Sequence, residues 1–265
     1  MYAFAYYRPA SIDDAVSFLK RHEGARPLSG GMTLVPTLKQ RLAEPTHLVD
    51  LTKLSELHGI TLRGATLRIA AATSHAQVAA SPVVAQALPA LATLAGLIAD
   101  PQVRNCGTIG GSVANNDPSA DYPAAVLGLN GTVVTNLRRI PADKYFIGMF
   151  ETALQETELV TAVEFPCPDS ATYLKYAHKA SGYAAPGVFV ARTGGRVRVA
   201  VTGAAPSVFR WTEAEDALGD AFDARALDGL LLDASLMLED ASAPAPYRAH
   251  LVKVCTRRAV ASLMR

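Results

Sequence analysis

The spacing of apolar and polar residues predicts alternating strands and helices at the start of the chain. A helix is expected after Ser11, a candidate N-cap that is followed by Asp14 and by apolar residues recurring on one face. Short apolar runs at residues 47–51 and 60–71 are typical of strands, and Gly64 divides the second run into the arms of a hairpin. The chain is therefore expected to begin with a strand–helix–strand unit and a hairpin.

Further helices and strands are expected up to a proline-rich connector. The apolar periodicity predicts helices at residues 33–42 and 83–98, and strands at residues 131–135 and 158–165. Two prolines follow the last of these strands closely, within residues 166–168. Proline cannot continue a strand ladder, so this segment is interpreted as a boundary between domains.

Residues 169–265 are expected to form a C-terminal domain in which strands precede helices, and residues 1–168 form the other domain. A long amphipathic helix over about residues 245–264 closes the chain. The strands expected before it are at residues 172–179, 187–191, 196–202 and 207–211.

Composition excludes several classes of function. The chain has 265 residues, half of them hydrophobic, and carries 25 basic against 24 acidic residues, which leaves a net charge of +1. Nucleic-acid-binding proteins usually carry an evident basic excess, so no nucleic acid partner is expected. The longest apolar stretch, residues 83–99, contains Pro89 and is too short for a bilayer, and the first residues lack a signal-peptide pattern. We expect a cytoplasmic protein without a transmembrane segment.

The sequence offers no catalytic or metal-binding constellation. Cys106, Cys167 and Cys255 are far apart, so they form no C-x-x-C pair, and the chain cannot hold a four-cysteine iron–sulfur cluster by itself. The six histidines never occur at i, i+4 spacing, and no nucleophile elbow or pair of carboxylates stands out. This absence fits a protein in which a bound cofactor carries the chemistry.

Two glycine-pair loops are the clearest candidates for ligand binding. They are residues 28–36, LSGGMTLVP, and residues 107–118, GTIGGSVANNDP. Paired glycines let consecutive backbone N–H groups point into one concavity, and Thr33 and Ser112 add hydroxyl donors. A helix starting at Thr33 would also direct its dipole at a phosphate. A single loop of this kind is more often a tight turn, but two converging loops would hold a pyrophosphate. Neither loop matches a Walker or Rossmann motif.

The second loop belongs to a longer string that resembles a known family. Residues 99–112, ADPQVRNCGTIGGS, resemble the flavoprotein (medium) subunits of the xanthine dehydrogenase and carbon monoxide dehydrogenase family of molybdenum hydroxylases. The likeness extends over essentially the whole chain, through residues 28–39 and the segments Tyr7-Arg8-Pro9, Asp121-Tyr122-Pro123-Ala124 and Thr256-Arg257-Arg258-Ala259.

The resemblance implies an α+β fold. Residues 1–168 would form a two-subdomain FAD-binding fold of the vanillyl-alcohol-oxidase (PCMH) type, with subdomains of about residues 1–55 and 56–168. Residues 169–265 would form a C-terminal α+β domain with a small antiparallel sheet and helices.

The resemblance also implies a set of FAD-binding residues. The pyrophosphate loops would be formed by Leu28, Ser29, Gly30, Gly31, Met32, Thr33, Leu34 and Val35, and by Thr108, Ile109, Gly110, Gly111 and Ser112. Relatives commonly carry a polar residue where this chain has Met32, which cannot donate a hydrogen bond, so a side-chain contact at this position is in doubt. The backbone role of the two glycines does not depend on it.

Five further positions are implied by the resemblance. Ile98 would pack beside the flavin, and Tyr183 would lie near the isoalloxazine ring, although alone it reads as an ordinary loop tyrosine. Asp121 would accept hydrogen bonds from cofactor hydroxyls, or it is simply a charge at a helix N-terminus. The backbone of Val160 would meet the adenine end. Lys175 would lie near the cofactor, whereas the residues alone suggest a charge at a strand edge.

The function implied by the resemblance is electron transfer. Substrate would be oxidised at a molybdopterin site on a large subunit, and two [2Fe–2S] clusters on a small subunit would reduce FAD on this chain. Reduced FAD would pass electrons to NAD, quinone, cytochrome or oxygen, within a hetero-oligomer that is often a dimer of heterotrimers. The chain would therefore be an oxidoreductase subunit with no catalytic residue of its own.

Three alternatives are weighed against this function. A stand-alone flavin oxidase would commonly link its flavin covalently through His or Cys, and Cys106 is the thiol nearest the glycine loops. A flavin-free scaffold would only hold other subunits together, which the intact glycine loops argue against. A nucleotide- or phosphate-binding module without redox function would bind ATP or ADP and show no flavin spectrum.

Overall fold

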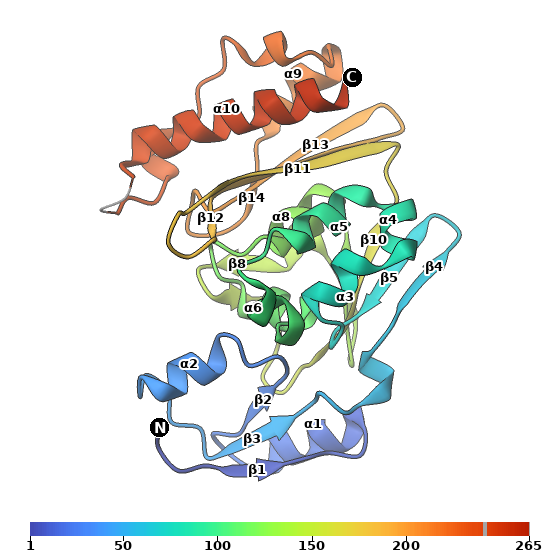
Figure 1. Cartoon of the computed structure of the whole chain (residues 1–265), viewed down its shortest axis with the longest axis vertical. Coiled ribbons are helices and arrows are strands. Elements are labelled where there is room, and N and C mark those ends of the chain that lie inside the picture. Colours follow the sequence, from blue (N-terminus) through green and yellow to red (C-terminus); the bar gives the residue numbers. More distant parts are fainter. Residues whose placement is uncertain (241–242, 265) are drawn as a thin grey trace.

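The computed structural model describes residues 1–240 and 243–264, and Figure 1 shows three units stacked along the longest axis. A small N-terminal unit lies at one end, a central unit combines a sheet with short helices, and a second sheet with the long C-terminal helix lies at the other end. The mixture of helices and largely antiparallel sheets confirms the predicted α+β class.

The N-terminal unit is the expected strand–helix–strand arrangement. Its three parallel strands pair in the order β1-β3-β2. The elements are β1 (Ala5–Tyr7), α1 (Ile12–Arg21), β2 (Arg26–Leu28), α2 (Leu34–Lys39) and β3 (His47–Asp50).

Local signals explain where the helices of this unit begin. Ser11 caps α1, because its hydroxyl accepts a hydrogen bond of 3.1 Å from the backbone N–H of Asp14, as the sequence predicted. The apolar face of α1 is buried against the small sheet, with Phe18 stacked on the ring of Tyr7. Helix α2 ends at Lys39, three residues before the predicted end.

The central unit is built on a five-stranded antiparallel sheet in the order β4-β5-β10-β6-β7. The predicted hairpin around Gly64 is present, with Ile60 opposite Ile69. The strands are β4 (Ile60–Arg63), β5 (Thr66–Ala70), β6 (Thr132–Thr135), β7 (Arg139–Pro141) and β10 (Val160–Pro166). Short segments complete the unit: η1 (Ser55–Leu57), η2 (Ala142–Lys144) and the pair β8 (Phe146–Gly148) and β9 (Glu151–Thr152).

Six short helices complete the central unit, some packed on its sheet and others on one another or on the C-terminal strands. They are α3 (His75–Ala80), α4 (Pro82–Ala87), α5 (Pro89–Gly96), α6 (Pro101–Cys106), α7 (Ile109–Asn115) and α8 (Tyr122–Gly128). Residues 100–123 show no apolar periodicity, yet α6, α7 and the start of α8 lie there. Side-chain caps from Asp100 and Thr108 start α6 and α7, so these helices depend on capping and packing rather than on an amphipathic face.

The C-terminal sheet pairs its four antiparallel strands in sequence order, β11 (Ser170–Ala177), β12 (Ala184–Thr193), β13 (Arg196–Thr202) and β14 (Phe209–Arg210). The last strand is shorter than the predicted run at residues 207–211. Alternate residues face opposite layers: Val188 and Val190 pack under the C-terminal helices, while Phe189 packs into the central core. The helical segments are α9 (Thr212–Asp220), η3 (Ala224–Leu227), η4 (Ala234–Leu236) and α10 (Ala245–Leu263).

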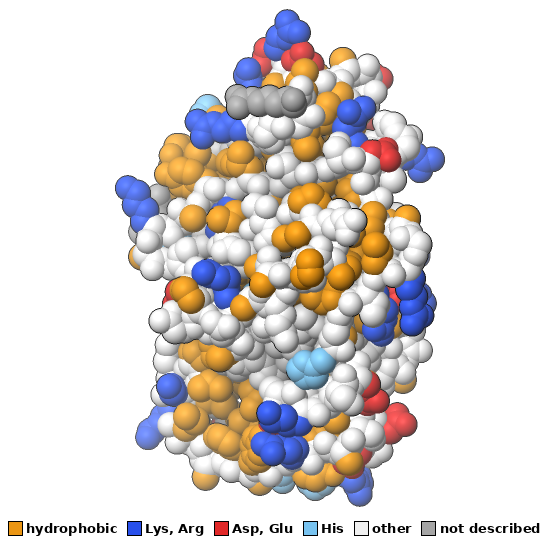
Figure 2. Space-filling view, turned by 45° about the vertical axis from the view of Figure 1, so that its right-hand side comes forward, with side chains coloured by type: hydrophobic (Ala, Val, Ile, Leu, Met, Phe, Trp, Pro, Cys, Tyr) orange, Lys and Arg blue, Asp and Glu red, His pale blue; other side chains and the backbone are white. Residues whose placement is uncertain are grey.

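Two surface properties bear on function. No helix within the described residues is both long enough and apolar enough to cross a membrane. On the face in Figure 2, Lys and Arg side chains are dispersed around the molecule with Asp and Glu among them, and they form no continuous basic patch.

Candidate functional site

A cavity of about 750 Å³ opens between the N-terminal unit and the central unit, and it contains both glycine loops. Its walls are formed by residues 22–34, 107–108, 110–112 and 154–160, and by the tip of the β11–β12 hairpin at residues 181–183. Cofactor sites typically enclose several hundred cubic ångströms. The predicted binding residues all line the cavity except Val35, Ile109 and Lys175.

The two glycine loops meet directly. A Cβ atom on Gly30 would lie 2.2 Å from the carbonyl oxygen of Cys106 and 2.6 Å from the Cα of Gly107, so only glycine allows this approach. The hydroxyl oxygens of Ser29 and Thr108 are 3.0 Å apart and share a hydrogen bond. The loops therefore form one surface, although 79 residues separate this hydroxyl pair in the sequence.

The first loop presents a run of free backbone donors. In the described part of the chain, none of the N–H groups of residues 29–33 donates a hydrogen bond to another protein group. Gly31 has a φ of +70°, a conformation that glycine adopts without strain and that turns neighbouring N–H groups toward one side. Thr33 then precedes helix α2, which begins at Leu34. Consecutive free N–H groups beside a cavity are suited to phosphate oxygens.

The second loop plays a different part from the one that its glycines suggested. The N–H of Ile109 donates to the carbonyl of Thr73, and the N–H of Gly110 donates to the carbonyl of Ala71. A Cβ on Gly110 would lie 2.5 Å from the Cβ of Ala71, so this glycine permits close packing of α7 on the strand end. These N–H groups are occupied because the first turn of α7 abuts the strand end. These two N–H groups of the second loop are therefore unavailable to a ligand, and the part of this loop is to support the first loop.

Gly111 and Ser112 are the parts of the second loop that face open space. Among the described residues, and apart from its chain neighbours and its own helix backbone, a Cβ on Gly111 would meet only the hydroxyl oxygen of Thr108, at 3.0 Å. Gly111 and Ser112 both line the cavity. A side chain at position 111 would therefore extend into the cavity rather than into the protein core.

Asp121 lines the cavity and forms a buried ion pair behind it. The Lys175 ammonium lies 2.9 Å from the Asp121 carboxylate, and the side chains of both residues are under 5 % exposed. The hydroxyl of Tyr173 donates a 2.6 Å hydrogen bond to the same carboxylate. Burial raises the pKa of Asp121, and the Lys175 charge and the Tyr173 hydrogen bond oppose this rise. Lys175 does lie on an edge strand, as its sequence context suggested, but its side chain is buried against Asp121.

Asp121 also occupies the N-cap position of α8, but its side chain makes no capping hydrogen bond. The carboxylate is directed to Lys175 and Tyr173 instead. The reading of Asp121 as a simple helix N-terminal charge therefore describes its place in the chain but not its contacts.

One end of the cavity is formed by a hairpin tip and a loop that touch. A Cβ on Gly182 would lie 3.4 Å from the Cα of Ala99, so the β11–β12 hairpin rests on the segment before α6. Ile98 and Tyr183 line the cavity at this contact, and Tyr183 is 44 % exposed. This end therefore combines apolar and aromatic surface with access to solvent.

Sequence reasoning missed His75, which lines the cavity and is buried. Burial, with a smaller contribution from the Arg104 charge, lowers the pKa of His75 to about 4. The imidazole is therefore neutral at ordinary pH, and its buried Nδ1 atom has no hydrogen-bond partner among the residues that the structure describes. The capping box of Ser74 and Gln77 places His75 at the first position of α3, but no sequence signal marks its burial.

The thiols and acidic groups show no further site. Cys106 is exposed and does not line the cavity, which weighs against a covalent flavin link through its sulfur. Among the described residues, no group of three or more His, Cys, Asp or Glu side chains is placed to hold a metal ion.

These features fit a dinucleotide cofactor such as FAD. The free N–H run of residues 29–33 suits a pyrophosphate, and Gly111 leaves cavity space that a side chain would fill. No lysine lies in either loop, so the donors are neutral. The remaining walls include apolar residues such as Leu57, Ile98 and Leu159.

Comparisons with known proteins agree with this fit. The family described as FAD binding domain in molybdopterin dehydrogenase matches residues 2–168. The carbon monoxide dehydrogenase medium chain of Afipia carboxidovorans is 38% identical over 275 residues, which cover 97% of this chain and 96% of the relative. The nicotine 6-hydroxylase medium subunit of Paenarthrobacter nicotinovorans is 34% identical, with coverage of 97% and 96%.

Solved structures give the same result. A chain of the reconstituted CO dehydrogenase from Oligotropha carboxidovorans superposes with a TM-score of 0.91 at 37% identity, covering 98% of this chain and 97% of that chain. A chain of the carbon monoxide dehydrogenase from Hydrogenophaga pseudoflava gives 0.88 at 34% identity, with coverage of 98% and 96%. With its FAD-binding domain and its full-length likeness to medium chains, this chain belongs to the family of FAD-binding medium subunits of molybdenum hydroxylases.

Proposed function

We propose that this chain is the electron-transfer subunit of its complex, in which FAD accepts electrons from the [2Fe–2S] clusters of a partner subunit and passes them to an external acceptor. The observation that carries the proposal is the run of free N–H groups at residues 29–33, which lies against the second glycine loop inside a large cavity. The chain itself supplies binding and orientation, as proteins do for flavin cofactors.

Three parts of the cofactor would bind to three parts of the cavity, each formed by its own residues. Residues 29–33 would bind the pyrophosphate, with Ser112 as an added hydroxyl donor. Ile98 and Tyr183 would hold the flavin end, where the cavity has apolar walls and an exposed rim. Val160 would lie at the adenine end, and Asp121 would accept hydrogen bonds from cofactor hydroxyls. Val35, Ile109 and Lys175 would support these residues from outside the cavity.

The complex would contain a molybdopterin-binding large subunit and a [2Fe–2S] small subunit, and the full assembly would be a cytoplasmic dimer of heterotrimers. Relatives that match this chain over nearly their whole length are named medium chains or medium subunits. Tyr183 is exposed at the rim, so electrons would enter and leave near this end of the cavity.

The chain would comprise two domains, residues 1–168 and 169–265, the first with subdomains of about residues 1–55 and 56–168. Three features support this division. The FAD-binding family matches residues 2–168, residues 167–169 join the five-stranded sheet to the C-terminal sheet, and residue 55 begins the short helix between the first two sheets.

Reoxidation kinetics test the proposed electron path. The purified complex would be reduced with dithionite, freed of excess reductant and mixed with oxygen or a water-soluble quinone while cluster absorbance is followed. A complex carrying Gly111→Val, and therefore depleted of FAD, should reoxidise its clusters at least about tenfold more slowly. Equal rates in a flavin-depleted complex would contradict the proposal.

A further inference from the structure

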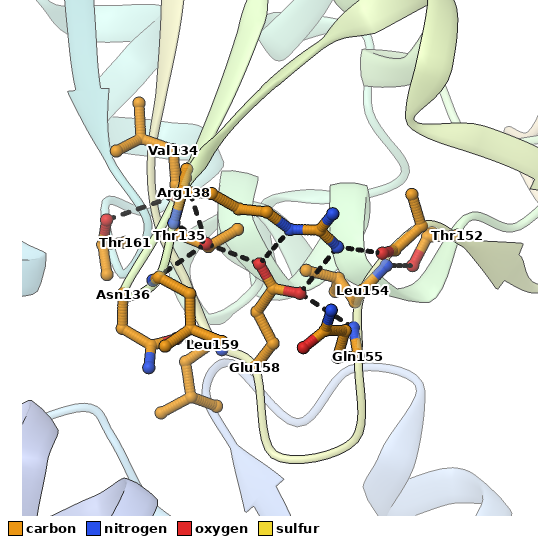
Figure 3. Close-up of polar contacts among 12 residues, drawn as sticks. Val134, Thr135, Asn136, Arg138, Thr152, Leu154, Gln155, Glu158, Leu159 and Thr161 are labelled. Carbon is orange, nitrogen blue, oxygen red and sulfur yellow. Dashed lines mark hydrogen bonds and ion pairs between the residues drawn. The ribbon is translucent and has the colours of Figure 1, made fainter.

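The loop between β9 and β10 forms a wall of the cavity. Residues 154–159 of this loop line it, and so do residues 22–27, which comprise the turn between α1 and β2 and the start of β2. In Figure 3 the loop that carries Gln155 and Glu158 extends toward the blue ribbon of the N-terminal unit. The shape of this wall therefore depends on how the loop is held.

A single buried carboxylate holds the loop. The Glu158 side chain has no solvent exposure. One of its oxygens accepts hydrogen bonds from the Thr135 hydroxyl at 2.7 Å and from Arg138 Nε at 3.0 Å. The other oxygen accepts from the Gln155 N–H at 2.8 Å and from Arg138 Nη2 at 3.0 Å, as Figure 3 shows. All the groups around this carboxylate are donors, so the charged form is satisfied.

The same arginine fastens the other end of the loop. Arg138 Nη2 also donates to the carbonyl oxygen of Ala153 at 2.6 Å, so one guanidinium joins both ends of the loop to the β6–β7 turn. Thr157, between these ends, has a φ of +63°, which is unfavourable for a branched residue. This conformation persists only where surrounding contacts impose it, and the Glu158–Arg138 pair supplies those contacts.

We propose that the Glu158–Arg138 pair is a positioning device for the adenosine half of the cofactor. It fixes residues 154–159 as the wall against which adenosine binds, facing residues 22–27. The inference rests on the proposed function, in which Val160, directly after this loop, lies at the adenine end. Burial would raise the pKa of Glu158, but the bonds from Arg138, Gln155 and Thr135 outweigh it and lower the pKa.

A substitution and a matched control test this role. Glu158→Gln keeps the size of the side chain but removes the charge and sets an amide where Arg138 and Gln155 need acceptors. Glu164→Gln is the control, because Glu164 lies on β10, the strand that follows the loop, pairs with Arg139 and does not line the cavity. The dissociation constants of FAD and of ADP would be measured on the full-length chain by calorimetry, together with the unfolding midpoint.

We expect Glu158→Gln to weaken the binding of both FAD and ADP about tenfold, because one charge-assisted hydrogen bond is lost. The dissociation constants of Glu164→Gln should stay within about twofold of wild type. If Glu158→Gln does not fold, Arg138→Lys replaces it, since the Arg138 side chain is 42% exposed and its change should be tolerated. Unchanged ADP affinity in either variant would overturn the inference. Failure of the wild-type chain to bind FAD would instead overturn the proposed function.

Discussion

The ammonium of Lys175 lies 2.9 Å from the carboxylate of Asp121, and this contact connects the C-terminal sheet to the wall of the cofactor cavity. Lys175 extends from β11, whereas Asp121 lines the cavity just before α8. The ammonium also donates to the carbonyl oxygen of Leu97 at 2.9 Å, next to Ile98 at the flavin end. The C-terminal sheet therefore supplies the countercharge for a group inside the site.

Removing one member of this buried pair should destabilise the protein strongly. Lys175→Met leaves the Asp121 carboxylate without its countercharge, and the cost of such a change is about 3–5 kcal/mol. Urea unfolding of the variant would measure the loss. The double variant Asp121→Asn/Lys175→Met removes both charges and should recover most of this stability. A loss below about 1 kcal/mol in the single variant would show that the pair is not buried as described.

Substitutions at Gly110 and at Gly111 in the second loop should have different effects. Gly111→Val places its side chain in the cavity, so FAD content should fall sharply while the unfolding midpoint stays close to wild type. Gly110→Val forces a side chain against Ala71 and should cost about 2 kcal/mol or more of stability. Flavin absorbance per folded chain and thermal unfolding would separate the two. A folded Gly111→Val protein with full FAD content would refute the placement of this loop.

The first loop should act through its backbone rather than through its side chains. Gly31→Ala must hold alanine at a φ of +70°, which costs about 1–2 kcal/mol, and its Cβ would lie 3.0 Å from Val35. We expect FAD to bind about tenfold more weakly to this variant. Met32→Ala should change the FAD dissociation constant by less than about twofold, because Met32 donates no hydrogen bond. Equilibrium titration of the apoprotein with FAD would measure both dissociation constants. A loss of FAD affinity greater than about twofold in Met32→Ala would contradict the backbone role.

His75 should make stability depend on pH in the acidic range. Its pKa is about 4 in the folded chain against an ordinary value of 6.5, so the unfolded chain binds the proton more readily. The stability that neutral His75 contributes is complete above pH 6.5 and is lost as the pH falls toward 4, by about 3 kcal/mol. His75→Gln should remove this part of the pH dependence, measured by urea unfolding from pH 4 to 7. The same change at exposed His58 should leave it intact, and identical profiles for both variants would contradict the assignment.

Where a local signal was strong, the sequence predicted structure correctly. The cap at Ser11, the hairpin at Gly64 and the long final helix are all present, because each depends on residues that are neighbours in the chain. The alternation in β12 also determined which residues face each layer. The short helices of residues 100–123 were missed because six or seven residues give too little periodicity, and their stability comes from caps and burial.

The candidate site was only partly predictable for a related reason. The glycine pairs identified both loops, but which loop has free N–H groups depends on α7 packing against residues 71–73, a contact absent from any local pattern. The burial of Lys175 and of His75 likewise follows from tertiary packing. Glu158 appeared only as the start of a strand, whereas its role depends on Arg138 in the neighbouring β6–β7 turn.

The most direct test of the central claim is a visible absorbance spectrum of the chain, purified with whatever partners accompany it, before and after acid precipitation. The account predicts a flavin band that is released into the supernatant, with iron–sulfur absorbance contributed by a partner subunit. Flavin that stays with the precipitated protein would indicate a covalent link and contradict the proposed site. A folded protein that remains colourless after supplementation with FAD would contradict the central claim.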